Sequence, residues 1–524
     1  MFEFKAIIRY SNFGNKLGFM EFIKDKKNII FTFFVIFTII IGVVLRIVAF
    51  YANDYYLTMD ECHSLAMVKY PFSFLFSRFE QGANFLPLYS VMLKFIYELV
   101  GVEPFYFKLS SLFAGITSVF IFYFLAKEIF KNKILILFSL VVFILNYNLL
   151  YFSSIIKPYI FDACFTMLII LFALKIRNRL LDNSLSYKFI CGLSILSVLI
   201  LWFSTPSIPV FYISLGILII EFLIKKNYKA LKQLILIVSI TSFFVLVEYF
   251  VYISQIHSDT ALKSMWLSND FFFYPNSYEA LNALINFSFY RFFWWDSALD
   301  VYFTNYVVFI FVLIFILGIL NFIREKNIVS LIIPSIITFF LVLSYLKIYP
   351  FCNRLIIFLI PLFIIVLFKA FDFKYYSKKY LVFPVLALFF TGFLLSYINL
   401  ESPLTKNYQM KNILNEKVYS LKVPSNDDVI LALALPYFYI FDNPNIINIE
   451  PNGYIENNEI NIEFDSLLDG KKTVYLFFFL LDTPMEKLSL YSNRIIQNGY
   501  SLIDKFDGDP VGLREYSYYK FVKN

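Results

Sequence analysis

Long apolar runs alternate with short polar connections along the first 400 residues of the chain. A helix needs roughly 20 apolar residues to cross about 30 Å of hydrocarbon, and shorter runs suit tilted or kinked neighbours. The runs lie near 29–50, 105–126, 134–152, 159–174, 189–204, 207–224, 233–253, 304–323, 328–346, 355–371 and 380–399. This pattern predicts a polytopic α-helical membrane protein with about 11 transmembrane helices.

The pattern changes after residue 400. Short alternating or β-branched runs at 427–435, 472–481 and 511–522 predict strands, and residues 485–498 predict a helix that stops at Asn498-Gly499. We therefore expect a small α/β domain over 401–524. It follows a cytoplasmic N-terminal segment over 1–28 and a transmembrane domain over 29–400.

Composition supports the membrane interpretation. Hydrophobic residues make up 60% of the 524 residues, charged residues make up 16%, and the mean hydropathy is +0.71. A soluble domain carries about 45–50% apolar and about 25% charged residues. The difference excludes soluble, fibrous, disordered and disulfide-scaffold proteins. The four cysteines show no spacing typical of a metal site.

The basic residues predict the orientation of the chain in the membrane. The N-terminal segment and alternate loops carry 23 Lys and Arg residues, whereas the opposite loops carry 8. By the positive-inside rule the N-terminus is cytoplasmic, so loops 51–104 and 254–303 and the segment 401–524 lie outside. The net charge of +7 divides into +12 for residues 1–400 and −5 for 401–524. The basic excess sets orientation, and we expect no nucleic-acid partner.

An acidic pair in the first outside loop is the main candidate for chemistry. Asp60 and Glu61 lie about ten residues beyond the first apolar run, and His63 follows them. Two adjacent acids and a histidine can supply a general base with an orienting partner, or can bind a divalent cation. The alternative is structural, since Asp60 or Thr58 would also cap a short helix.

Lys157 and Arg354 form a second candidate group, because they are among the few basic residues on the outer side. An arginine there can bind a phosphate with two hydrogen bonds, although either side chain could instead extend to lipid headgroups. His257 opens the second outside loop, and its pairing with Glu61 or His63 on a metal is a weak alternative.

Four more charged residues lie within or near the predicted spans. Arg46 and Lys108, near outer ends, are expected to pair with the outside acids or to extend to the headgroups. Asp162 and Glu248 are expected to face the bundle interior.

The order of these features resembles the GT-C membrane glycosyltransferases, in particular the family 39 type, which includes the protein O-mannosyltransferases and the lipid A aminoarabinose transferases. The matching pieces are an arginine near the end of the first span, Asp60-Glu61-Cys62-His63, Leu86-Pro87-Leu88-Tyr89, Phe107-Lys108-Leu109-Ser110-Ser111-Leu112, Lys157-Pro158-Tyr159, and Tyr349-Pro350-Phe351 through Arg354. The chain departs from the family pattern at Leu86, Lys108, Lys157 and Leu355.

The resemblance implies a transferase that uses a polyprenyl-phosphate sugar. In this reading Asp60 is the general base, Glu61 assists it, and Lys157 and Arg354 bind the donor phosphate. His63, Tyr89 and Tyr159 are then expected to contact substrate.

The acceptor would be a glycan, lipid or protein hydroxyl at the outer face of a bacterial plasma (inner) membrane. The sequence identifies no cofactor, and it leaves open whether the protein binds a divalent metal ion. A polytopic transporter or lipid flippase and a surface polysaccharide polymerase or ligase are the alternatives.

Overall fold

The computed structural model describes a helical membrane part and a C-terminal sheet. The longer described stretches are residues 16–52, 87–101, 103–182, 186–254, 301–325, 327–351, 353–372, 427–433, 463–479, 485–506 and 516–524. Between them it describes 61, 64–65, 68, 71–72, 272, 446–449, 455–456 and 459–460. Asp60, His63 and His257 lie outside these residues, as does the last predicted span, 380–399.

The other ten predicted runs are helical. The helices are α2 (Lys16–Ala52), α4 (Pro87–Val100), α5 (Pro104–Ile129), α6 (Lys133–Leu145), α7 (Tyr147–Phe152), α8 (Tyr159–Leu181), α9 (Tyr187–Leu201), α10 (Ser207–Ile224), α11 (Tyr228–Glu248), α15 (Val301–Arg324), α16 (Ile332–Tyr345) and α17 (Ile360–Lys369). The π-helix η4 (Tyr249–Ile253) continues α11, and the 3-10 helices η5 (Ile328–Leu331) and η6 (Asn353–Leu359) precede α16 and α17.

Among the described residues, six segments are long and apolar enough to cross a membrane, and the protein is an integral membrane protein. They are Asn28–Ala52, Pro104–Ile129, Tyr159–Leu181, Ser207–Ile224, Tyr228–Ile253 and Ile328–Tyr345. Lys133–Leu145, Lys188–Leu201 and Phe309–Arg324 are shorter apolar helices. The predicted number of about 11 spans is thus not confirmed by the described residues.

The predicted run 134–152 is two helices and not one. Helix α6 ends at Leu145, and the side chain of Asn146 accepts a hydrogen bond from the amide of Leu149 at 3.1 Å, which caps the start of α7. Asparagine is a strong N-cap because its short side chain satisfies an amide that has no partner within the helix. The apolar composition around Asn146 hides this break from a hydropathy reading.

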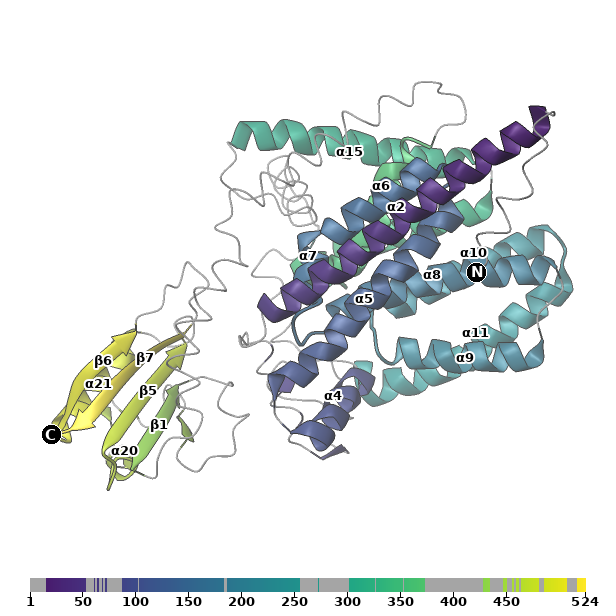
Figure 1. Ribbon diagram of the computed structural model, residues 1–524. Coiled ribbons are helices and arrows are strands. Elements are labelled where there is room, and N and C mark those ends of the chain that lie inside the picture. The colour runs from purple at the N-terminus through teal and green to yellow at the C-terminus, as the bar shows by residue number, and fades with distance from the viewer. Residues whose placement is uncertain are drawn as a thin grey trace.

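Helix α5 lies against both α2 and α8 in the helical part (Figure 1). Helix α2 packs on α5 and α6, and α5 packs on α8. Gly115 of α5 allows one close approach, because a methyl group there would lie 2.3 Å from the hydroxyl oxygen of Ser153. The loop after α7 therefore rests directly on the backbone of α5.

The C-terminal strands form a five-stranded mixed sheet of order β2-β1-β5-β7-β6. The strands are β1 (Asp428–Leu433), β2 (Ile446–Ile449), β5 (Thr473–Phe479), β6 (Tyr500–Phe506) and β7 (Tyr516–Lys523), and β3 (Ile455–Glu456) pairs with β4 (Glu459–Ile460). Strands β2, β1 and β5 are parallel, whereas β7 runs antiparallel to β5 and β6.

The predicted strands and helix of this region are confirmed. Helices α20 (Glu463–Ser466) and α21 (Met485–Gln497) complete it, and α21 ends just before Gly499, which has a φ of +87°. Glycine adopts this left-handed conformation without a steric penalty. The core joins sheet residues such as Val474 and Phe521 to Leu488 and Tyr491 of α21. Strands β2, β3, β4 and β6 were not predicted.

Candidate functional site

Glu61 is the described member of the acidic pair, and it is fully buried. Its Oε1 accepts a hydrogen bond from the backbone amide of Ile156 at 2.7 Å. The Nζ of Lys108, also fully buried, lies 3.8 Å from the same oxygen. The carboxylate thereby joins the predicted loop 51–104 to α5 and to the loop before α8. Of the two expectations for Lys108, pairing with an acid of that loop is confirmed.

The loop from 153 to 158 presents Lys157 to this region. The amide of Lys157 donates to the carbonyl of Ile155 at 2.9 Å, which makes a tight turn. Ser153, Ser154 and Lys157 are all buried, with Lys157 only 4% exposed. A side chain buried to this extent does not extend to lipid headgroups, which was the alternative for Lys157.

Tyr89 lies on α4, next to Glu61. Its ring meets those of Phe161 and Phe203 edge-on at centroid distances of 6.1 and 5.6 Å, and the amide of Leu88 donates to the carbonyl of Trp202 at 3.4 Å. Burial raises the pKa of the Tyr89 phenol well above its ordinary value, and the neighbouring Glu61 carboxylate raises it further. The hydroxyl therefore stays protonated and acts as a hydrogen-bond donor or acceptor, not as a base.

Asp162 joins this cluster from the first turn of α8. Its side chain is 8% exposed and is hydrogen-bonded to Ser204, whose Oγ accepts from the Oγ of Ser207 at 2.7 Å. The Asp162 carboxylate acts electrostatically on Tyr89, as does Tyr159. The sequence placed Asp162 inside the bundle, which is confirmed, but did not associate it with the site. Its position three residues after Tyr159, on the same face of one helix, was the available signal.

Tyr159 and Arg354 lie on adjacent elements. Tyr159 begins α8 and its ring meets that of Phe152 edge-on at 5.2 Å. Arg354 lies on η6, which packs against α8, and its side chain is exposed. The structure thus brings Glu61, Lys108, Tyr89, Tyr159 and Asp162 into one polar cluster. It places Arg354 on a helix that packs beside this cluster.

Two further charged residues of the described helices are buried. Arg46 of α2 is fully buried: its Nη1 donates to the carbonyl of Gly42 at 3.0 Å, and its guanidinium lies 5.6 Å from the centre of the Phe143 ring. It therefore does not extend to the headgroups. Glu248, at the end of α11, is 1% exposed, as expected for a residue that faces the interior.

The described residues hold no group of three His, Cys, Asp or Glu side chains that could bind a metal ion. The Oε1 atom of Glu61 contacts Lys108 and the Ile156 amide. The pairing of Glu61 with His257 lies outside the described residues.

No protein-family model and no curated protein matches the chain. Solved structures do. ArnT from Cupriavidus metallidurans bound to undecaprenyl phosphate is similar with a TM-score of 0.50 and 11% identity, over 92% of this chain and 98% of that chain. The archaeal oligosaccharyltransferase AglB from Archaeoglobus fulgidus, in complex with an inhibitory peptide and a dolichol-phosphate, has a TM-score of 0.46 and 12% identity, over 94% and 74%.

ArnT, a lipid A aminoarabinose transferase, is a GT-C superfamily structure. The likeness to it shows that this chain has the GT-C fold, and it confirms at the level of fold the resemblance that the sequence motifs indicated. At 11% identity it establishes the architecture alone.

Proposed function

We propose that the protein is a membrane glycosyltransferase that moves a sugar from a polyprenyl-phosphate donor to an acceptor hydroxyl. The observation that carries the proposal is the buried polar cluster around Glu61, built at the start of α5 and α8 within a GT-C fold. ArnT, which shares the fold, was solved with undecaprenyl phosphate bound. A buried cluster of this kind is costly in a membrane and is typical of a functional site.

Basic side chains lie in and beside the cluster. Lys108 is a buried member, Lys157 is buried in the loop before α8, and Arg354 lies on η6, which packs against α8. Basic side chains of this kind can bind a phosphate. We assign Lys157 and Arg354 to the donor phosphate, where they would stabilise the negative charge that develops on the leaving group.

Asp60 is our candidate for the general base. It would accept the proton of the acceptor hydroxyl as the acceptor oxygen attacks the anomeric carbon and the bond from that carbon to the phosphate oxygen breaks. Glu61 next to it is held by Lys108 and Ile156, so it would fix the position of the loop that carries Asp60. A single displacement of this kind inverts the anomeric centre. Tyr89, Tyr159 and His63 would contact the substrates.

The charge pattern supports an outward-facing site, and the resemblance to bacterial members of the family supports a bacterial plasma (inner) membrane. By the positive-inside rule, the basic residues favour a cytoplasmic N-terminus and an outside location for residues 401–524. The acceptor would then be an envelope glycan, a lipid or a protein hydroxyl. A divalent metal would need ligands beyond the described residues.

The test is transfer by an Asp60→Asn variant in membranes, with a radiolabelled undecaprenyl-phosphate sugar as donor. Loss of a general base typically costs about 10²–10⁴-fold in rate, so we expect transfer to fall at least a hundredfold. Asp182→Asn, at the opposite end of α8, is the matched control and should transfer normally. Normal transfer by a stably folded Asp60→Asn protein would remove Asp60 as the base. Activity with a nucleotide sugar alone would refute the donor.

A transporter or lipid flippase is the second candidate. Glu248 favours it, because both carboxylate oxygens are buried and have no hydrogen-bond partner among the described residues. Such acids are typical of ion and proton pathways in transporters. The same radiolabelled donor separates the two functions. A flippase moves the lipid across the bilayer with its sugar attached, whereas a transferase releases polyprenyl phosphate.

A further inference from the structure

The segment that carries Arg354 has an unusual backbone. Helix η6 keeps 3-10 geometry for seven residues, Asn353–Leu359, whereas 3-10 runs beyond three or four residues are uncommon. Pro361 bears on the end of this run. In an α-helix the carbonyl of Ile357 would take its hydrogen bond from the amide of residue 361, but proline has no N–H and its ring crowds that carbonyl. The sequence thus disfavours α geometry just before Pro361.

Tyr349 adds a second constraint from outside the helix. Its hydroxyl donates to the carbonyl of Leu355, the residue after Arg354, at 2.9 Å. The Tyr349 ring is held edge-on to Phe340 at 5.2 Å and to Phe358 at 6.3 Å between centroids. The hydrogen bond therefore ties the turn that carries Arg354 to a fixed aromatic cluster.

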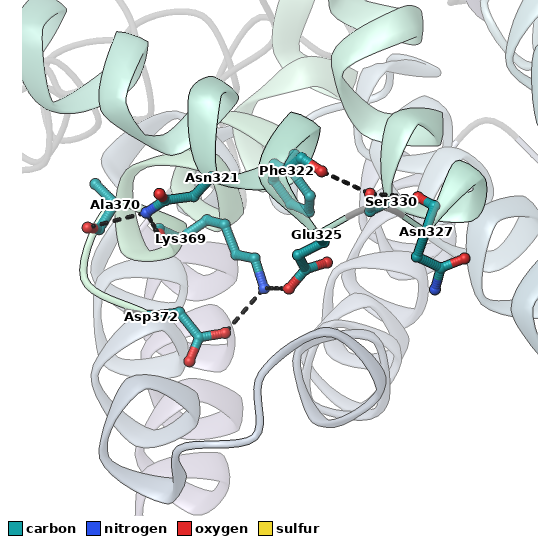
Figure 2. A network of polar contacts seen from close by, with 8 residues as sticks. All are labelled: Asn321, Phe322, Glu325, Asn327, Ser330, Lys369, Ala370 and Asp372. Atoms are coloured by element: carbon teal, nitrogen blue, oxygen red, sulfur yellow. Dashed lines mark hydrogen bonds and ion pairs between the residues drawn. The ribbon is translucent and has the colours of Figure 1, made fainter. Parts of the chain in front are cut away.

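Helix α17 directly continues η6, and side-chain contacts hold its far end. Figure 2 shows the Nζ of Lys369, at the end of α17, between Glu325 Oε1 at 2.5 Å and Asp372 Oδ2 at 2.8 Å. The Nδ2 of Asn321 donates to the carbonyls of Lys369 and Ala370 at 3.0 and 3.3 Å. These contacts satisfy the last carbonyls of α17 and attach it to α15.

A close backbone approach reinforces this attachment. Gly318 of α15 lies so near α17 that a methyl group at position 318 would lie 2.0 Å from the carbonyl oxygen of Val366. Helices α15 and α17 thus pack closely against each other around Gly318 and Val366.

The geometry of η6 decides where Arg354 points. A 3-10 helix turns 120° and rises about 2.0 Å per residue, and an α-helix turns 100° and rises 1.5 Å. Over the five steps from Leu359 to Arg354, the two geometries differ by about 100° in the rotation of residue 354 around the helix axis. They differ by about 2.5 Å in its position along that axis. We propose that Tyr349 and Pro361 are positioning residues that hold η6 as a 3-10 helix and so direct the Arg354 guanidinium toward the donor phosphate. The inference rests on the phosphate role proposed above for Arg354.

A double-mutant cycle tests whether Tyr349 acts through Arg354. We expect Tyr349→Phe to lower kcat/KM for undecaprenyl-phosphate sugar about fivefold, the effect of one net hydrogen bond. In the Arg354→Ala background the same change should have no further effect. Tyr212→Phe is the matched control, since it removes a hydroxyl bonded to Ser242 Oγ at 3.0 Å and should leave kcat/KM within about twofold. Equal losses in both backgrounds would overturn the proposal.

A second readout does not depend on activity. Arg354→Cys in a full-length protein whose own cysteines are replaced can be labelled with a maleimide, and the rate reports the orientation of position 354. We expect Tyr349→Phe together with Pro361→Ala to slow labelling several-fold. An unchanged rate would overturn the positioning role. Normal transfer by Arg354→Ala would instead refute the phosphate role of Arg354, and the labelling rates would still decide whether Tyr349 and Pro361 set the geometry of η6.

Discussion

The buried pair of Glu61 and Lys108 yields the sharpest stability prediction. Both side chains are fully buried, with Lys108 Nζ 3.8 Å from Glu61 Oε1. At that distance Coulomb's law with an effective dielectric constant of about 20 gives an attraction of about 4 kcal/mol. Replacing one partner leaves the other as an uncompensated buried charge, which typically costs about 3–5 kcal/mol.

Three variants separate the contributions. Glu61→Ala removes the charge and the acceptor of the Ile156 amide, so we expect it to be the least stable. Glu61→Gln keeps an acceptor for that amide but leaves Lys108 uncompensated, so it should be intermediate. Glu61→Gln with Lys108→Met removes both charges and should regain most of the lost stability, because replacing a whole buried pair is often neutral or stabilising.

The measurement is thermal unfolding of the detergent-solubilised protein, followed by the fluorescence of a thiol-reactive dye or by loss of monodisperse protein. The expected order of midpoint temperatures is wild type and double variant together, then Glu61→Gln, then Glu61→Ala. A double variant as unstable as Glu61→Gln alone would refute the reasoning, since the loss would then not come from an unpaired Lys108. Transfer by the double variant would separately show whether the charge of Glu61 is needed for activity.

Two further predictions concern the helix contact and the C-terminal sheet. Gly318→Ala should destabilise the protein by about 1–3 kcal/mol, because its methyl group would force α15 away from the Val366 carbonyl. Gly216→Ala is the control and should leave stability unchanged, because the space around Gly216 is open. Thermal unfolding of the two variants measures the difference. The hydrogen bonds from Arg494, at 2.5–2.8 Å, lower the pKa of Asp465 below its ordinary value near 4. Their stabilising effect is therefore complete above about pH 4 and is lost as the pH falls through the depressed pKa. Hydrogen–deuterium exchange of the α21 amides in the full-length protein, corrected for intrinsic rates, should become faster over that pH range in the wild type. The same acceleration in Asp465→Asn would contradict the assignment to Asp465.

The helical membrane part was largely predictable because it depends on local composition. A run of roughly 20 apolar residues is driven into hydrocarbon wherever it occurs, and its backbone must then form a helix. The predicted run 207–224 coincides with α10, and the predicted strand 472–481 contains β5. The breaks were not predictable from hydropathy, because Asn146 and Pro361 each act through a single backbone hydrogen bond within an apolar run.

The site was predictable only in part. Motif order identified Glu61, Lys157 and Arg354 as candidates, since charges on the outer side are rare and conspicuous. It did not identify Asp162 as a neighbour of Tyr89, because the two residues come from different helices and lie 73 positions apart in the chain (162 minus 89). Nor did it predict that the carboxylate of Glu61 would bond the loop before α8.

The sequence by itself determined that this chain is a membrane protein, where most of its apolar helices and three of its strands lie, and which few charges are candidates for chemistry. These properties follow from the free energy of transferring each residue from water to hydrocarbon, which is additive along the chain. Only the tertiary structure decided that Lys108 pairs with Glu61 and that η6 keeps the 3-10 geometry that carries Arg354. Those outcomes depend on contacts between distant segments, whose energies arise only when the helices are packed together.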